Sequence, residues 1–226
     1  RGRRPEATSP AAASEASADP RYGGWMREEA QRIDDRLEGT LRVPEGEPTA
    51  IVVIAHPLPT HGGTMRNPLV AAVARACASR GWYALRFNFR GVGNSAGEWT
   101  GGQQEPHDIA AAVEHARRLA PDLPIGLVGY SFGALMALRW IADGGRPTAY
   151  ALVGLPLRSV SLAPQDLPPI PAGSFVVAAE HDQFGTAAEL RRALVDASVA
   201  EVRGVDHFFV GKRDEVARLV TDHLAA

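Results

Sequence analysis

The chain has 226 residues, of which 45% are hydrophobic and 22% charged, with 24 Lys and Arg against 26 Asp and Glu. At about 150 residues per domain this length fits one domain with a tail, and a chain of this size buries roughly 70% of its unfolded surface without metal or disulfide staples. The near-neutral charge gives no reason to expect nucleic acid as a partner, and the single cysteine, Cys77, excludes an internal disulfide. No apolar run approaches the roughly 20 residues of a membrane-spanning helix, so no membrane partner is expected.

The first residues differ in composition from the rest of the chain. Residues 1–20 hold Ala, Ser, Pro, Arg and Glu and no large apolar side chain, so they cannot bury enough surface to offset the entropy of ordering them. We therefore expect a flexible tail over residues 1–24 and one domain over residues 25–226. No apolar stretch of signal-peptide length follows the opening Arg-Gly-Arg-Arg, and a cytoplasmic location is expected.

The remaining sequence alternates β-rich runs with helical patterns. In chain order it predicts a strand at 39–43, a strand at 51–55, a helix between Asn67 and Gly81, a strand at 82–89, a helix at 105–119, a strand at 125–130, a helix at 132–142, strands at 150–155 and 175–179, a helix at 186–197, a strand at 199–202 and a helix at 214–223. The run 51–55 is apolar at every position, as in a strand covered on both faces. This alternation indicates the α/β class, a doubly wound, mostly parallel sheet, with 39–43 at its edge.

One motif indicates chemistry. Gly129-Tyr-Ser-Phe-Gly133 matches G-x-S-x-G and falls between an apolar strand and a helical pattern. That context predicts a tight strand-to-helix turn that exposes the Ser131 hydroxyl as a nucleophile at the carboxyl edge of the sheet. The alternative is a serine that only caps the helix. Ser131 can serve as both, because the N–H groups at a helix start also stabilise an oxyanion.

A serine hydroxyl needs a histidine base, and the histidine needs a carboxylate that orients it. Asp182 lies just beyond a predicted strand, and His207 lies between a predicted strand and the last helix. We therefore predict that Ser131, His207 and Asp182 act as nucleophile, base and orienting acid. His181 is the nearest rival for the base.

Two other carboxylates compete for the acid role. Glu180 is close to Asp182 in sequence, and Asp206 directly precedes His207. Because neighbouring side chains usually point apart, Asp182 is preferred to Asp206.

An oxyanion requires two backbone N–H donors. One is predicted to come from Phe132, the residue after the nucleophile, and the other from the loop after the strand 51–55. That loop reads His56-Pro57-Leu58-Pro59. Since proline has no N–H, Leu58 is the only donor within Pro57–Pro59. His56 is interpreted as a brace for this turn rather than as a second base.

Four blocks in chain order carry a family resemblance. They are His56-Pro57-Leu58-Pro59 with Gly62-Gly63-Thr64-Met65, then Arg90-Gly91-Val92-Gly93-Asn94-Ser95, Gly129–Gly133, and Asp206-His207-Phe208-Phe209. Over about residues 38–226 the chain resembles the α/β-hydrolase superfamily, and within it the small, lid-poor bacterial serine hydrolases. The resemblance implies the α/β-hydrolase fold and no metal or organic cofactor. Relatives often carry a second histidine at the position of Leu58. The turn Arg90–Gly97 is interpreted as scaffold.

The segment between the strands 150–155 and 175–179 is too short for a helical lid. Pro156–Gly173 has 18 residues and five prolines, which break any long helix. A minimal lid leaves the site open and favours small, accessible esters. Aromatic residues predicted to line the pocket are Trp99, Tyr130, Phe132, Phe184 and Phe208, of which Tyr130 and Phe208 are assigned to substrate binding.

The pattern as a whole predicts a serine hydrolase that acts on a small ester or related acyl substrate through an acyl-enzyme. One alternative keeps the same three residues in an acyltransferase or cyclase, whose first half-reaction is identical. The other is a non-catalytic binding module, which predicts that Ser131, Asp182 and His207 lie too far apart to form hydrogen bonds. The oligomeric state is not assigned.

Overall fold

The computed structural model describes residues 27–158 and 167–226. The flexible tail expected over residues 1–24 lies outside the described residues. The strands are β1 (Arg27–Ile33), β2 (Leu37–Val43), β3 (Ala50–Ala55), β4 (Trp82–Phe87), β5 (Ile125–Tyr130), β6 (Ala149–Val153), β7 (Phe175–Ala179) and β8 (Ser198–Val202). The helices are η1 (Pro59–His61), α1 (Pro68–Ser79), α2 (Glu105–Leu119), α3 (Phe132–Ala142), α4 (Ala187–Ala193) and α5 (Arg213–Leu224).

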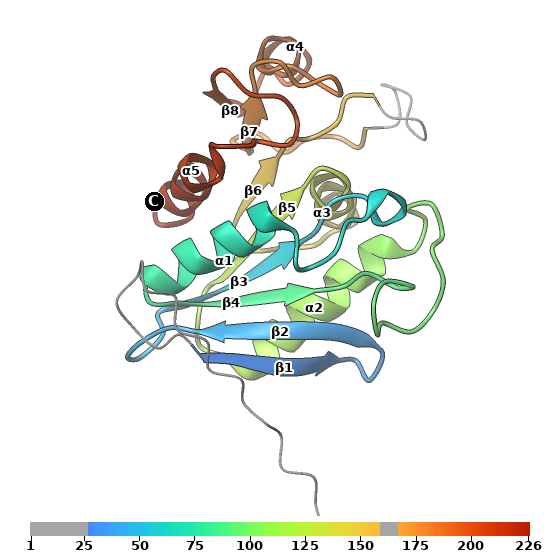
Figure 1. Ribbon diagram of the computed structural model, residues 1–226, viewed down its shortest axis with the longest axis vertical. Helices are drawn as coiled ribbons and strands as arrows, with labels where there is room; N and C mark the ends of the chain where they lie inside the picture. The colour runs from blue at the N-terminus through green and yellow to red at the C-terminus, as the bar shows by residue number, and fades with distance from the viewer. Residues whose placement is uncertain (1–26, 159–166) are drawn as a thin grey trace, which may run out of the picture.

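The described strands form one sheet in the order β1-β2-β4-β3-β5-β6-β7-β8 (Figure 1). β1 pairs with β2 and β2 with β4 in antiparallel fashion, and every other neighbouring pair is parallel. Helices cover both faces, with α1 and α5 on one and α2, α3 and α4 on the other. The predicted fold class, a doubly wound and mostly parallel α/β sheet, is confirmed.

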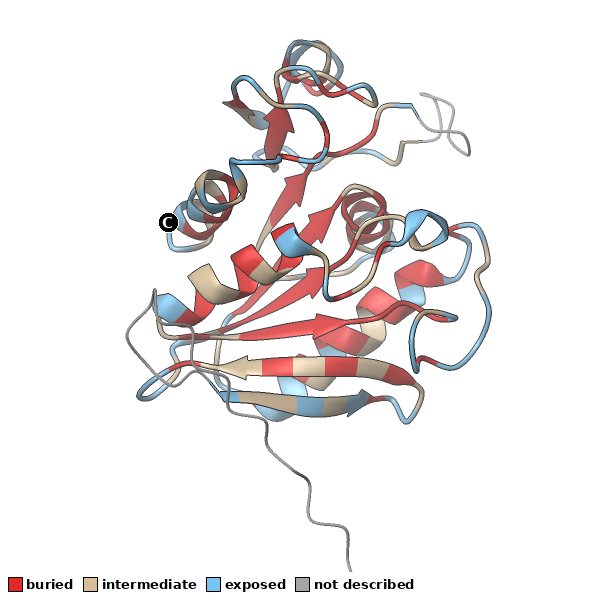
Figure 2. Ribbon diagram, viewed as in Figure 1, coloured by how far each residue is buried: buried red, intermediate tan, exposed pale blue. Residues whose placement is uncertain are grey.

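The central strand β3 shows why an unbroken apolar run is needed. Ile51 and Val53 pack into the core under α2 and α3, whereas Val52 and Ile54 pack into the core under α1 and α5. Successive side chains of a strand point to opposite faces, so a strand with helices on both sides buries every residue. The red central strands in Figure 2 contrast with the partly exposed β1.

The predicted edge of the sheet is wrong. The strand expected at 39–43 is β2, which lies one strand in, and the edge is β1. β1 escapes detection because it is rich in charge and fully buries only Ile33, as suits an edge strand that must not pair with another chain. A turn at Asp34 and Asp35, both with φ of 51°, joins the two strands.

Three predicted elements also end earlier in the structure. The strand expected at 82–89 stops at Phe87, where Asn88 turns its side chain to Met65 N and Phe89 N donates to the His56 ring. The strand expected at 150–155 spans 149–153 and ends before Gly154, which has a φ of 55°. The helix expected at 186–197 spans only 187–193, since the following residues turn into β8.

The connection between β6 and β7 contains no helix in its described parts, residues 154–158 and 167–174. Of the helices that the structure describes, none has the length and apolar character required to span a membrane.

Candidate active site

Ser131 occupies a strained turn between β5 and α3. Its φ is 54° and its ψ is −114°, a conformation that costs a non-glycine residue on the order of 1–3 kcal/mol. The glycines on either side of this turn allow a close approach of backbone segments that a side chain would prevent. A Cβ on Gly129 would lie 2.4 Å from the carbonyl oxygen of Gly133, and one on Gly133 would lie 2.6 Å from that of Ala55. Ser131 is the N-cap of α3, but its hydroxyl caps none of the helix N–H groups.

The hydroxyl of Ser131 instead meets His207. Ser131 Oγ lies 2.8 Å from His207 Nε2, and His207 Nδ1 lies 2.7 Å from Asp182 Oδ2. His207 is 4% and Asp182 2% exposed. The second carboxylate oxygen, Oδ1, accepts the N–H of Phe184 at 2.8 Å. The structure therefore brings together the three side chains that the sequence singled out, in an order suited to moving a proton from the hydroxyl to the imidazole.

Several contacts fix the orientation of the His207 ring. Phe184 meets the ring edge-on at a centroid distance of 4.7 Å. Gly154 faces the ring, and a Cβ there would lie 3.2 Å from His207 Cε1. The Tyr130 hydroxyl donates to the carbonyl oxygen of His207 at 2.9 Å. Burial, with the nearby charge of Asp182, raises the pKa of Tyr130, so the phenol remains a donor. This contact commits the hydroxyl of Tyr130 to the histidine loop.

The rival residues have partners elsewhere. His181 is exposed and lies 3.7 Å from the carboxylate of Glu180. Glu180 accepts the N–H of Gly204. Asp206 is exposed and accepts the N–H of Phe208, two residues on. None of these groups bonds to the Ser131 hydroxyl or the His207 ring.

His56 braces the loop that follows β3. It is fully buried, its Nδ1 lies 2.7 Å from the carbonyl oxygen of Pro57, and its Nε2 accepts the N–H of Phe89 at 3.1 Å. These partners assign the proton to Nδ1. Burial lowers the pKa of His56 to about 4. A neutral, doubly bonded ring supports the turn, as expected for a brace.

This burial predicts a pH-dependent stability. Because the unfolded chain binds a proton near pH 6.5 and the folded chain only near pH 4, the contribution of His56 is complete above pH 6.5 and is lost as the pH falls toward 4. The full loss amounts to about 3 kcal/mol. Urea unfolding across this range should show a shallower decline in a His56→Gln variant, and equal slopes in both proteins would contradict the prediction.

Leu58 and Phe132, whose backbone N–H groups are predicted to hold an oxyanion, line the same cavity as Ser131. In the described part of the chain neither group donates to a protein acceptor. The loop after β3 requires glycine at position 63, because a Cβ on Gly63 would lie 2.1 Å from the carbonyl oxygen of Pro57.

The cavity at Ser131 has a volume of about 480 Å³. It is lined by the predicted aromatic residues Trp99, Tyr130, Phe132, Phe184 and Phe208, of which Phe208 is 55% exposed. Sequence reasoning missed the wall formed by α3, where Leu135, Met136 and Arg139 follow Phe132 at intervals of three, four and seven residues. That spacing places all four on one face of a helix. This wall could therefore have been predicted from the sequence that follows Ser131.

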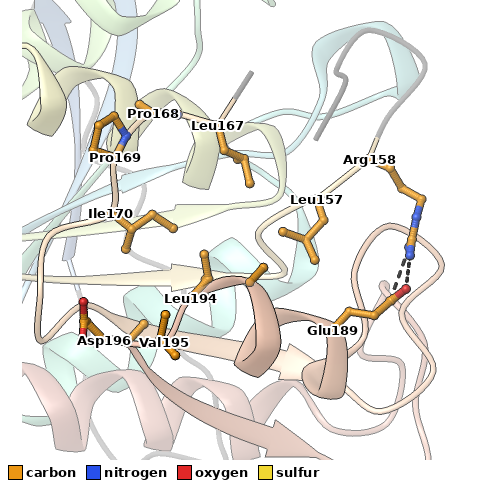
Figure 3. Close-up of a pocket in the computed structure, with 12 residues that line it drawn as sticks. Leu157, Arg158, Leu167, Pro168, Pro169, Ile170, Glu189, Leu194, Val195 and Asp196 are labelled. Atoms are coloured by element: carbon orange, nitrogen blue, oxygen red, sulfur yellow. Dashed lines mark hydrogen bonds and ion pairs between the residues drawn. The ribbon is translucent and has the colours of Figure 1, made fainter. Parts of the chain in front are cut away.

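A second cavity, of about 500 Å³, lies between α4 and the described ends of the β6–β7 connection (Figure 3). Its walls are mostly apolar, with Leu157, Ile170 and Leu194 among them. Arg158 and Glu189, which also line it, form an ion pair with each other. None of the predicted site residues lines it, so the candidate active site is the cavity at Ser131.

The turn that begins at Arg90 anchors α2 to the sheet. Asp108 on α2 is fully buried and accepts Arg90 Nε at 2.9 Å, Arg90 Nη2 at 2.8 Å and Arg36 Nη1 at 2.8 Å. Ser95 donates to the carbonyl oxygen of Asn88 at 2.7 Å. The polar groups of this turn are thus engaged within the protein, in agreement with its interpretation as scaffold.

A mostly parallel eight-stranded sheet with a serine on a strained turn between β5 and α3 defines an α/β hydrolase. The sequence model of the family Hydrolase_4, described as serine aminopeptidase, S33, matches residues 46–198, which is well over half of the chain. The chain therefore belongs to this family, and the resemblance to the α/β-hydrolase superfamily is confirmed.

Several known proteins are similar to this chain over most of its length. An α/β serine hydrolase homologue from Coxiella burnetii is 27% identical, with a TM-score of 0.75 over 87% of this chain and 96% of that one. XC6422 from Xanthomonas campestris, an α/β serine hydrolase without lid, is also 27% identical, with a TM-score of 0.77 over 88% and 94% of the two chains. The uncharacterized protein RP471 of Rickettsia prowazekii is 25% identical over 202 residues, 84% of this chain and 85% of that protein. The protein is thus similar to serine hydrolases of the α/β fold.

Proposed function

We propose that this protein is a carboxylesterase-like serine hydrolase that cleaves a small ester or related acyl substrate through an acyl-enzyme. The observation that carries the proposal is the pair of hydrogen-bond distances, 2.8 Å from Ser131 Oγ to His207 Nε2 and 2.7 Å from His207 Nδ1 to Asp182 Oδ2. This arrangement activates a serine hydroxyl that is otherwise a weak nucleophile.

In the first half-reaction Ser131 Oγ attacks the carbonyl carbon while its proton passes to His207 Nε2. The carbonyl oxygen becomes an oxyanion and accepts the N–H groups of Phe132 and Leu58. Asp182 holds the Nδ1–H and stabilises the imidazolium. When the intermediate collapses, the bond to the leaving alkoxide breaks, and the alkoxide takes the proton from Nε2. The product is an ester of Ser131 and a free alcohol.

In the second half-reaction a water molecule takes the place of the alcohol. It gives one proton to His207 Nε2 as its oxygen attacks the acyl carbon, and the second tetrahedral intermediate uses the same two N–H donors. Collapse breaks the bond to Ser131 Oγ, which recovers its proton from Nε2. The acyl group leaves as a carboxylic acid, and the enzyme returns to its starting state.

The charge on the cavity wall favours an ester over an aminopeptidase substrate. Arg139 carries the one permanent charge among the described residues that line the cavity. Among the described residues that line the cavity there is no Asp or Glu to pair with the α-ammonium group of a peptide N-terminus, which would therefore be desolvated without a counter-charge. An uncharged or anionic ester meets no such penalty.

The distances in the site count against one of the two alternative functions and do not separate the other from the esterase. A non-catalytic module requires that Ser131, His207 and Asp182 be separated, and distances of 2.8 and 2.7 Å count against it. An acyltransferase or cyclase would share the first half-reaction and replace water by another acceptor. Product analysis in the presence of a competing alcohol or amine separates them, and we expect the free acid to dominate.

The proposed nucleophile is tested by covalent labelling. A fluorophosphonate probe should modify the wild-type protein on Ser131, located by peptide mass spectrometry, because the activated hydroxyl attacks phosphorus as it attacks a carbonyl carbon. Ser131→Ala should take no label, and Ser79→Ala, which changes an exposed serine of α1, should label like wild type. Equal labelling of Ser131→Ala and wild type would end the proposal.

A further inference from the structure

Arg139 lies at the end of the α3 wall that begins beside the nucleophile. Phe132, Leu135, Met136 and Arg139 share one face of α3, and all four line the cavity. Ser131 and Arg139 are eight residues apart, which corresponds to about 12 Å along a helix axis. The residues that line the cavity thus run from the serine that carries the reactive hydroxyl, past apolar side chains, to an arginine.

The guanidinium has donors to spare. Arg139 is half-buried, and its Nη1 donates to the carbonyl oxygen of Gly102 at 2.9 Å. Within residues 27–158 and 167–226, no carboxylate forms an ion pair with it. Glu105, which supports the same loop, accepts Thr100 N, Thr100 Oγ1 and Gly102 N. An arginine has five N–H donors in a fork that matches a carboxylate.

The wall between the two ends is apolar. Leu135 and Met136 are buried on α3, and Trp99 packs on the Phe132 ring at a centroid distance of 4.9 Å. Gly102 packs closely against this end of the wall, since a Cβ there would lie 3.0 Å from Arg139 Nη1 and 3.1 Å from Met136 Cε. A ligand suited to this surface is apolar in its middle and anionic at its far end.

We propose that Arg139 is a specificity-determining residue that binds a carboxylate at the far end of the acyl chain, so that the preferred substrates are monoesters of dicarboxylic acids. This inference rests on the proposed esterase function. The acyl group remains bonded to Ser131 Oγ between the two half-reactions, so an anchor on that group holds the substrate in both. The carboxylate and the guanidinium form a charge-assisted, bidentate pair.

The test compares matched substrates. The p-nitrophenyl monoesters of adipate and suberate carry a free carboxylate, and their methyl-capped diesters have almost the same length without the charge. The measured quantity is the ratio of kcat/KM for the monoester to kcat/KM for the capped ester. Arg139→Gln should lower this ratio about tenfold, mainly through a higher KM for the monoester, because it removes one charge-assisted pair.

Two further variants separate charge from loop support. Arg139→Lys keeps the cation but loses the bidentate fork, so its ratio should fall between those of the wild type and Arg139→Gln. Arg117→Gln removes a surface charge on α2 and should leave the ratio unchanged. If Arg139→Gln lowers kcat/KM for both esters equally and leaves the ratio unchanged, the contact with Gly102 accounts for the loss and the carboxylate anchor is wrong.

The other possible results of the substrate comparison also test the carboxylate anchor. A wild-type protein that hydrolyses both esters of a pair equally well disproves the anchor and leaves the esterase proposal intact. A wild-type protein that hydrolyses neither ester and takes no fluorophosphonate on Ser131 disproves both. A preference that appears only when the carboxylate is placed on the alcohol part of the ester overturns the assignment to the acyl chain.

Discussion

Replacement of Ser131 by alanine is expected to lower kcat for p-nitrophenyl ester hydrolysis by about 10⁶-fold, since the attacking atom and the proton that His207 accepts are both lost. The change removes one oxygen and retains the φ of 54°, so the alanine protein bears the same backbone strain. Its melting temperature should therefore stay close to that of the wild type. Steady-state kinetics and a thermal melt on the same preparations measure both quantities.

The same substitution at a second serine tests whether any Ser→Ala change lowers the activity. Ser79 is exposed near the end of α1 and donates to the carbonyl oxygen of Arg75. Ser79→Ala should retain the wild-type kcat. Substantial turnover by Ser131→Ala, together with an unchanged melting temperature, would mean that another group attacks the substrate.

The turn at Ser131 could be predicted from the sequence because its cause is local. The close approach of the chain at Gly129 and Gly133 requires glycine at fixed offsets from Ser131. The apolar strand before the turn and the helical pattern after it supplied the context. The same local logic located α2 and β7 at their observed bounds.

The carboxylate that orients His207 could not be identified from the local sequence alone. Asp182, Glu180 and Asp206 all lie in loops after strands, and only the fold determines which of them reaches the His207 ring. Asp182 is preferred to Asp206 because Asp206 adjoins His207 in sequence, and the side chains of neighbouring residues usually point apart. The hydrogen bond of 2.7 Å from Asp182 to His207 agrees with this preference.

Two features were missed for opposite physical reasons. β1 is held by backbone pairing and carries charges that suit an exposed edge, so its composition does not look like that of a strand. Arg139 lies in a helix whose other residues are mostly buried and apolar, and a single charge in such a helix is usually taken for its solvent-exposed face. Only the cavity shows that this arginine borders the site.

The Asp182→Asn variant is expected to lower kcat by about 10⁴-fold while the fold is kept. The carboxylate of Asp182 accepts the Nδ1–H of His207 and so leaves Nε2 free to take the proton of Ser131. An asparagine can turn its amide N–H toward Nδ1, which places the ring proton on Nε2. The imidazole then donates to Ser131 and cannot act as its base. Steady-state kinetics on a p-nitrophenyl ester measures the loss.

The neighbouring acid provides the control. Asp206→Asn makes the same change of charge beside His207, on a side chain that is exposed and accepts the N–H of Phe208. An asparagine can accept that N–H equally well, so this variant should stay within a few-fold of the wild-type kcat. A large loss in Asp206→Asn combined with a small loss in Asp182→Asn would show that Asp206 orients the imidazole during catalysis. The paired variants thus distinguish orientation of the ring from the general effect of a negative charge near the base.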